Sequence, residues 1–240
     1  MPQDTAALRS ILSLAPVVPV IILDDVSQAR PLAEALVAGG LPILEVTLRT
    51  PNALKVMEEM AKVTGAIVGS GTVRTALHMK QSVDAGCRFM VSPGISPRIL
   101  DAADDIGIPL LPGIATPSEA MTASERGYGF LKFFPAEANG GAPVLKAFAS
   151  PLSDITFCPT GGIDAAKAKV YLGLPNVICV GGSWIMPADA LASNDWGRIE
   201  ALADEVLGHQ PPRGRGLGTE GEAVAAHRLG QRQSLWLFLY

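Results

Sequence analysis

The sequence predicts an α/β protein, a (β/α)8 TIM barrel preceded by an N-terminal helix. Eight short apolar segments recur along the chain, and amphipathic segments separate them. Successive apolar segments begin roughly 20 to 26 residues apart, about the length of one strand, one helix and two short loops. Strands that are apolar throughout indicate a parallel sheet covered by helices, and eight of them indicate closure into a barrel.

The chain begins with a predicted helix over residues 4–14, in which Ala7, Leu8, Ile11 and Leu12 recur at helical spacing. A proline at position 16 ends it, because proline does not continue a helix. The apolar segments predict strands at 17–22, 43–47, 66–68, 89–91, 109–111, 130–133, 156–158 and 177–180. The segments between them predict helices at 26–38, 51–62, 75–85, 97–105, 117–126 and 165–172, with a last helix at 195–207.

Composition narrows the class of protein. We expect the barrel to occupy residues 1–207 of the 240 as one large domain. The formal net charge of −4 gives no general attraction to nucleic acid or to an anionic membrane surface. The start of the chain is not basic and the first apolar run contains a proline, so we expect neither a secretion signal nor a membrane span. Cys87, Cys158 and Cys179 lack metal-ligand spacing, which predicts buried, reduced thiols in a cytoplasmic protein.

The residues at the ends of the predicted strands point to one functional face. Polar, glycine or proline residues stand there at Glu45, Thr47, Arg49, 69–72, 92–94, 112–113, 159–162 and 181–183. In a parallel barrel these carboxyl ends meet at the face where barrel enzymes have their active sites. Glycines that only make tight turns would explain any one of these loops, but they explain six at the same end less well.

Lys132 is a candidate nucleophile. It lies within the apolar segment 129–135, whereas the other six lysines fall in polar, helical segments. Burial disfavours the ammonium form, and a neutral amine can attack a carbonyl group to form a Schiff base. The alternative is a structural lysine whose stem packs in the core while its head reaches solvent or pairs with a carboxylate.

Glu45 is the candidate proton-transfer group. Side chains alternate along a strand, so Glu45 and Lys132 enter the same barrel interior if their faces both point inward. Schiff-base chemistry needs a group that moves protons to and from the carbinolamine and the substrate, and a partly desolvated glutamate is suited to this. The alternative is a structural ion pair of Glu45 with Lys132 or Arg49, and both descriptions can hold before substrate binds.

Two more side chains lie at the same predicted rim. Arg49 is placed to hold a substrate carboxylate through two parallel hydrogen bonds, although it can instead lie on the surface or cap a helix. Thr72 follows a glycine-rich turn and offers a hydroxyl group and a backbone amide. The histidines fall in a helix and in the C-terminal segment, so they predict no zinc site. We therefore expect an amine mechanism without a metal or another cofactor.

Gly161 and Gly162, together with the run Gly181, Gly182 and Ser183, form a predicted site for a phosphate group. They follow the seventh and eighth strands, where barrels often bind phosphate. Paired glycines let backbone amides approach an oxyanion, and the start of the next helix adds the positive end of its dipole. One such pair is weak evidence, but two on consecutive strands carry more weight.

Five motifs together resemble one family: LEVTLR at 44–49, GSGT at 69–72, PGIATPSE at 112–119, KFFPAE at 132–137 and PTGG at 159–162. The family is that of the 2-keto-3-deoxy-6-phosphogluconate (KDPG) aldolases of the Entner–Doudoroff pathway, which are similar to 4-hydroxy-2-oxoglutarate (KHG) aldolases. The resemblance runs from about residue 8 to residue 207. It implies a homotrimeric class I aldolase, a lyase that cleaves a phosphorylated keto sugar acid into pyruvate and glyceraldehyde 3-phosphate.

The resemblance also implies roles for individual residues. Lys132 would form the Schiff base, and Glu45 would be the acid/base group. The resemblance implies Arg49 and Thr72 for the pyruvate moiety, Pro93 and Phe134 around its pocket, and Gly161, Gly162, Gly182 and Ser183 at the phosphate. Thr160 would be a further substrate-binding residue.

Two alternatives stay open on the sequence. One is a related activity, that of a KHG aldolase or of an aldolase for 2-keto-3-deoxy-6-phosphogalactonate, because these enzymes share the lysine and the pyruvate-binding residues. The other is a barrel that binds a phosphorylated metabolite without turnover, in which Lys132 is only an ion-pair partner in the core.

Residues 208–240 depart from the family pattern, because family members end soon after a helix such as 195–207. The part from 210 to 221 is rich in glycine, proline and arginine, which predicts a flexible tail. The apolar end at 235–240 is too short to span a bilayer. We expect a species-specific tail or an altered reading frame in preference to a docking peptide.

Overall fold

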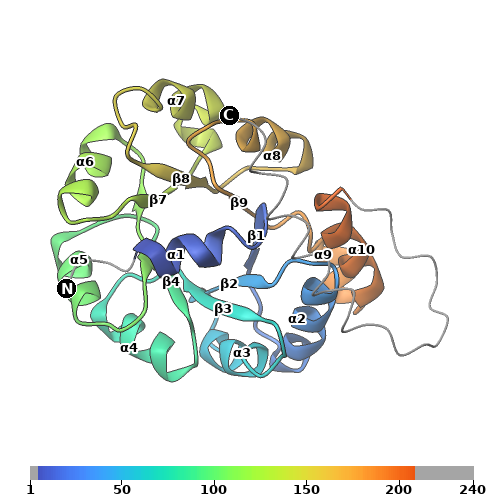
Figure 1. Ribbon diagram of the computed structural model, residues 1–240. Coiled ribbons are helices and arrows are strands. Elements are labelled where there is room, and N and C mark those ends of the chain that lie inside the picture. The colour runs from blue at the N-terminus through green and yellow to red at the C-terminus, as the bar shows by residue number, and fades with distance from the viewer. Residues whose placement is uncertain (1–4, 209–240) are drawn as a thin grey trace. The chain divides into compact units, whose positions relative to one another are not determined.

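Parallel strands alternate with helices along residues 5–208, the part of the chain that the computed structural model describes (Figure 1). The helices are α1 (Thr5–Leu12), η1 (Val26–Gln28), α2 (Ala29–Ala38), α3 (Ala53–Met60), α4 (Ala76–Asp84), α5 (Pro97–Asp104), α6 (Pro117–Glu125), η2 (Glu137–Asn139), α7 (Gly141–Phe148), α8 (Ala165–Leu172), α9 (Ala188–Ala192) and α10 (Trp196–Val206). The strands are β1 (Val17–Ile21), β2 (Ile43–Thr47), β3 (Ile67–Gly71), β4 (Phe89–Val91), β5 (Leu110–Leu111), β6 (Gly113–Ile114), β7 (Phe130–Phe133), β8 (Thr156–Pro159) and β9 (Val180–Gly182). Apart from Gly208, the predicted tail lies outside the described residues.

The strands form two parallel sheets. One has the order β5-β4-β3-β2-β1-β9, and the other has the order β6-β7-β8. Only Pro112 separates β5 from β6 along the chain, and isolated parallel bridges join Phe157 to Val177 and Thr160 to Gly181. The result is an α/β fold with a curled parallel sheet of six strands, and the helices other than α1 surround the strands (Figure 1).

Burial on both faces explains why the strands are apolar runs. All five residues of β1 and of β2 are buried, including Glu45 and Thr47. A parallel sheet has helices on its outer face and side chains filling its inner face, so neither face is left to water. The two polar side chains of β2 therefore need a partner inside the fold.

The helices begin at residues that satisfy their free amide groups. Thr75, Ser96 and Asp164 each accept a hydrogen bond from a first-turn amide of α4, α5 and α8. At α6, Thr116 and Glu119 form a reciprocal capping box. These caps lie directly after the strands, so they also fix the loops in which the site is found.

Five predicted strands have different bounds in the structure: those at 17–22 and 156–158 are shifted by one residue at one end, and the other three differ more. β3 continues through Gly71, because Gly69 gives room for the Phe89 ring and remains in the ladder. The segment after residue 109 divides at Pro112, which has no amide hydrogen to donate, although its carbonyl group accepts a hydrogen bond from the amide of Lys132. The last strand begins at Val180, not at residue 177.

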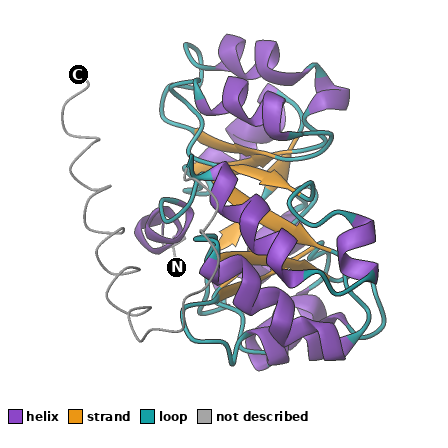
Figure 2. Cartoon of the chain, turned by 90° about the vertical axis from the view of Figure 1, so that its right-hand side faces the viewer, coloured by secondary structure: helices purple, strands orange, loops and turns teal. Residues whose placement is uncertain are grey.

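Helix α1 lies across one end of the strands in both views (Figures 1 and 2). Only residues 13–16 connect it to β1, so this is the end at which the strands begin. Leu8 and Leu12 are its buried residues. The opposite end, where the strands finish, holds the polar residues described below. Among residues 5–208, no helix is long and apolar enough to cross a membrane.

Candidate active site

Lys132 and Glu45 meet inside the fold. The Lys132 ammonium nitrogen lies 3.0 Å from Oε1 and 3.5 Å from Oε2 of Glu45. The side chains are only 5% and 4% exposed. Lys132 stands in register with Gly113 and Cys158, and Glu45 with Gly69, so two strands that are far apart in sequence direct these groups to one point. A buried amine and a carboxylate in contact can exchange a proton without solvent.

Gly71 and Phe134 shape the space around this pair. A Cβ atom on Gly71 would lie 2.4 Å from Oε1 of Glu45, so only glycine leaves the carboxylate its position. The Lys132 nitrogen lies 5.2 Å from the centre of the Phe134 ring, over its negative face. Gly71 belongs to the GSGT motif at 69–72, but its position in the sequence does not indicate the contact with Glu45.

Arg49 and Thr72 contact one another at the rim. The Arg49 Nε donates a hydrogen bond of 3.2 Å to the Thr72 hydroxyl group, and Arg49 is exposed. Thr72 has a φ of 61°, a left-handed conformation that is strained for a β-branched residue. The chain bends sharply here, directly after Gly71. Glu45 is paired with Lys132 and not with Arg49, so the guanidinium group remains at the surface of the site.

Pro93 is half-buried beside the start of β6. A Cβ atom on Gly113 would lie 2.5 Å from the Pro93 carbonyl group, and the Gly113 amide donates to the Ser92 hydroxyl group at 3.4 Å. Gly113 is also the residue in register with Lys132. The segment containing Pro93 therefore packs against the neighbour of the lysine strand.

Gly161 and Gly162 form the turn after β8. Their φ angles are +107° and +75°, which residues with side chains rarely adopt. The Gly161 carbonyl group accepts a hydrogen bond of 3.1 Å from the amide of Glu137, a residue of the loop after β7. The turn is thus tied to the same loop that follows Lys132.

Thr160 brings the turn after β8 next to the end of β9. It forms an isolated bridge with Gly181, and its hydroxyl oxygen occupies the place where a Cβ atom of Gly181 would be. This hydroxyl group is buried and has no hydrogen-bond partner within residues 5–208. Ser183 is exposed one residue beyond Gly182. The predicted phosphate-site residues are therefore neighbours in space.

Cys158 and Cys179 lie close to the lysine and glutamate pair. Cys158 is in register with Lys132, and both thiols are buried. A hydrogen bond with Cys158, burial and the nearby Glu45 charge raise the pKa of Cys179 well above its usual range. A neutral thiol adds no further negative charge beside Glu45. Within the described residues, no group of histidine, cysteine, aspartate and glutamate side chains could hold a metal ion.

Known proteins match the part of the chain that contains these residues. The model of the KDPG and KHG aldolase family matches residues 8–202. The chain is 50% identical over 200 residues to the KHG/KDPG aldolase of Escherichia coli K12, covering 83% of this chain and 94% of that protein. It is 48% identical over 200 residues to the 2-dehydro-3-deoxy-phosphogluconate aldolase of Pseudoalteromonas atlantica, covering 83% and 93%.

Solved structures agree with this relationship. The KDPG aldolase of Legionella pneumophila, with pyruvate captured at low pH as a covalent carbinolamine intermediate, has a TM-score of 0.80 and 45% identity, covering 82% of this chain and 97% of that one. The KDPG aldolase of Zymomonas mobilis ZM4 with 3-phosphoglycerate has a TM-score of 0.78 and 47% identity, covering 82% and 93%. The chain belongs to the KDPG and KHG aldolase family.

Proposed function

We propose that the protein is a class I aldolase that cleaves KDPG into pyruvate and glyceraldehyde 3-phosphate. The observation that carries this proposal is the buried contact of 3.0 Å between Lys132 and Glu45. Membership of the family supports it, and so does the carbinolamine of pyruvate captured in the Legionella relative. No metal or organic cofactor has a part in the proposed reaction.

In the first step, Lys132 becomes a nucleophile. Its ammonium group transfers a proton to the Glu45 carboxylate across the contact between them. The free amine then attacks the C2 keto carbon of the substrate, and a carbinolamine forms. Glu45 returns a proton to the carbinolamine hydroxyl group, which leaves as water, so that a protonated Schiff base links Lys132 to the substrate.

In the second step, the bond between C3 and C4 breaks. Glu45, again a carboxylate, removes the proton of the C4 hydroxyl group. The electron pair of that O–H bond forms the aldehyde carbonyl group, and the pair of the C3–C4 bond moves toward the iminium nitrogen. The products are glyceraldehyde 3-phosphate and an enamine of pyruvate on Lys132. Protonation of C3 by Glu45 and hydrolysis by water then release pyruvate and the free lysine.

Arg49 and Thr72 are proposed to bind the pyruvate carboxylate. They lie together at the rim, and a guanidinium group can hold a carboxylate through two parallel hydrogen bonds. Pro93 and Phe134 are proposed to form the walls of this pocket. The Phe134 ring lies against the lysine nitrogen and excludes water from it.

The substrate phosphate is proposed to bind at Gly161, Gly162, Gly182 and Ser183, with the unpaired hydroxyl group of Thr160 donating to a substrate oxygen. Glycines with positive φ allow backbone amides to surround an oxyanion, and the start of α8 follows directly. The 3-phosphoglycerate in the Zymomonas structure is consistent with a family that accepts phosphorylated acids.

The remaining parts of the proposal concern the whole molecule. The single proline between β5 and β6 and the bridges from β8 toward β9 support a closed (β/α)8 barrel that occupies residues 1–207. We also propose a cytoplasmic homotrimer, and the buried free thiols favour a reducing compartment. Light scattering coupled to size-exclusion chromatography tests the trimer directly, because a monomer or a dimer would contradict it.

The test of the substrate is a comparison of three compounds. Pyruvate release is measured with KDPG, with the same sugar acid lacking its phosphate, and with 4-hydroxy-2-oxoglutarate. We expect kcat/KM to be highest for KDPG and to fall by at least about tenfold without the phosphate, since a charged ligand group loses its hydrogen bonds. The name of the Escherichia coli relative favours 4-hydroxy-2-oxoglutarate as a second substrate. Equal or higher kcat/KM for the unphosphorylated compounds would contradict the assignment to KDPG.

A further inference from the structure

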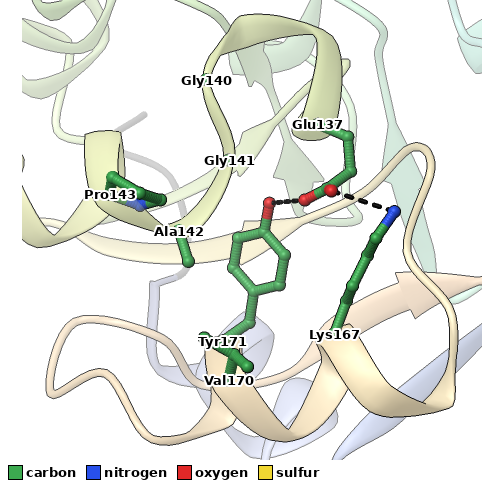
Figure 3. A pocket seen from close by; sticks show the side chains of 8 residues that line it. All are labelled: Glu137, Gly140, Gly141, Ala142, Pro143, Lys167, Val170 and Tyr171. Atoms are coloured by element: carbon green, nitrogen blue, oxygen red, sulfur yellow. Dashed lines mark hydrogen bonds and ion pairs between the residues drawn. The ribbon is translucent and has the colours of Figure 1, made fainter.

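We infer that Glu137, Lys167 and Tyr171 are positioning residues that hold the Gly161–Gly162 turn in the conformation that binds the substrate phosphate. This inference rests on the phosphate site proposed above. Figure 3 shows the three side chains, which we call the brace, with Glu137 between the other two. They border a pocket of about 350 Å³ that also has Gly140 and Gly141 in its wall.

Glu137 links two loops of the site. Its Oε1 accepts a hydrogen bond of 2.5 Å from the Tyr171 hydroxyl group, and its Oε2 lies 3.0 Å from the Lys167 nitrogen. Its backbone amide donates to the Gly161 carbonyl group, and a Cβ atom on Gly162 would lie 2.9 Å from the Glu137 side chain. Glu137 therefore touches both glycines and is fixed by two residues of α8.

Lys167 holds the second glycine. Its ammonium nitrogen donates a hydrogen bond of 2.9 Å to the Gly162 carbonyl group while it pairs with Glu137. The helix cap adds to this arrangement, because the Asp164 side chain accepts from the Lys167 amide at 2.9 Å. Lys167 thus connects the start of α8, the turn before it and the loop after β7.

The two fixed carbonyl groups determine where the amides point. In a trans peptide the C=O and N–H bonds point in opposite directions, and the peptides after Gly161 and Gly162 are trans. The Gly161 and Gly162 carbonyl groups are held on the side of Glu137 and Lys167. The amides of Gly162 and Ile163 consequently point away from the brace, and within the described residues neither has an acceptor.

Glycine makes this support necessary. Two consecutive glycines have more accessible backbone conformations than any other pair, so an unsupported turn would lose more entropy when it closes on a phosphate. Tyr171 also supports the turn, because its ring is buried and its hydroxyl group donates a hydrogen bond to the Glu137 carboxylate. The brace thereby orders the turn before substrate arrives.

Lys167→Met tests the inference, with Lys169→Met as its matched control. Both changes remove one charge from α8, but Lys169 is exposed and lies outside the brace. We expect Lys167→Met to raise KM for KDPG by about tenfold, because the turn loses a hydrogen bond from a charged donor, while kcat falls less than about twofold. We expect KM for 4-hydroxy-2-oxoglutarate and borohydride trapping of pyruvate to remain unchanged.

Two further variants separate positioning from charge. Lys167→Arg keeps a charged hydrogen-bond donor, so its KM for KDPG should stay close to the wild-type value. Tyr171→Phe removes no charge, and we expect it to raise that KM by about twofold to threefold through the freed Glu137 carboxylate. An equal loss with both substrates, or the same loss in Lys169→Met, would overturn the brace. A wild-type enzyme without preference for the phosphorylated substrate would overturn the phosphate site and the brace together, whereas a preference that Lys167→Met leaves intact overturns the brace alone.

Discussion

Two lysine and glutamate pairs in this protein have the same separation of 3.0 Å and differ in their surroundings. Lys132 and Glu45 are 5% and 4% exposed, whereas Lys167 and Glu137 are 44% and 31% exposed. The first pair lies between strands, and the second joins α8 to the short helix η2. Burial, and not distance, separates a pair suited to proton transfer from one suited to holding a turn.

The difference follows from the solvation of the charges. An exposed pair gains little stability, about 0 to 1 kcal/mol, because water screens the attraction. A buried pair is costly to break, about 3 to 5 kcal/mol, because removal of one partner leaves the other charge without water or a counter-ion. The buried pair is retained where chemistry needs both groups, which is the interpretation that we give to Lys132 and Glu45.

Replacement of each lysine by methionine should give the largest contrast. We expect Lys132→Met to reduce kcat by about 10⁴-fold or more, because no nucleophile remains for the Schiff base. Urea unfolding should show a loss of about 3 kcal/mol, since Glu45 becomes an unpaired buried carboxylate. The same measurement on Lys167→Met should show a loss below about 1 kcal/mol. Equal losses in the two variants would contradict the account of burial.

Glu45→Gln tests the second member of the buried pair. The amide keeps the size of the side chain and an oxygen that can accept from Lys132, but it cannot carry protons. We expect steady-state kinetics to show a fall in kcat of about 10² to 10⁴-fold with little change in KM. Activity close to that of the wild type would show that another group transfers the protons.

Gly71→Ala should disturb the pair without touching either charge. The new methyl group would meet Oε1 of Glu45 at 2.4 Å and displace the carboxylate from Lys132. We expect a fall in kcat of about 10 to 100-fold, because misplacement of a reacting group by an ångström has effects of that order. Gly107→Ala is the control, since a Cβ atom there meets nothing within 4 Å. Similar kinetics for both variants would argue against a precise position for Glu45.

Acid should weaken the exposed pair by a small amount. The Tyr171 hydrogen bond and the Lys167 ion pair hold the pKa of Glu137 below its usual range, although partial burial opposes them. A carboxyl group with a lowered folded-state pKa contributes stability above the unfolded value of about 4.3, and this is lost as pH falls through the folded value. The difference in unfolding free energy between wild type and Glu137→Gln should therefore be present at pH 7, begin to fall at about pH 4.3, and vanish once the pH lies below the lowered pKa of Glu137. A difference that persists at lower pH would exclude the ionised carboxylate as its cause.

Much of this arrangement could be predicted from the sequence. An apolar strand around Lys132 and alternation of side chains along a strand were sufficient to place the lysine and Glu45 in one interior, and the structure brings them into contact. The alternation of wholly apolar segments with amphipathic ones likewise predicted parallel strands, and every strand pair is parallel. These features follow from local patterns, and local patterns are visible in one sequence.

Contacts between loops were not visible in the same way. Helix α7 was not predicted, because it begins at two glycines with positive φ, Gly140 and Gly141. The end of β3 was not predicted, because its glycines were assigned to a loop. The brace depends on the packing of α8 against the loop after β7, and nothing in the spacing of Glu137 and Lys167 indicates that contact. Lys132 and Glu45 are also distant in the sequence, but the alternation of side chains along their strands predicted that both enter the same interior.

Borohydride reduction of the protein in the presence of pyruvate tests the central claim most directly. The reductant converts a Schiff base into a stable secondary amine, and peptide mass spectrometry locates the modified lysine. We predict one pyruvyl adduct per chain, on Lys132 alone, and none in Lys132→Met. Correctly folded protein that forms no adduct, or forms adducts spread over surface lysines, would contradict the enamine mechanism and leave Lys132 as a structural partner of Glu45.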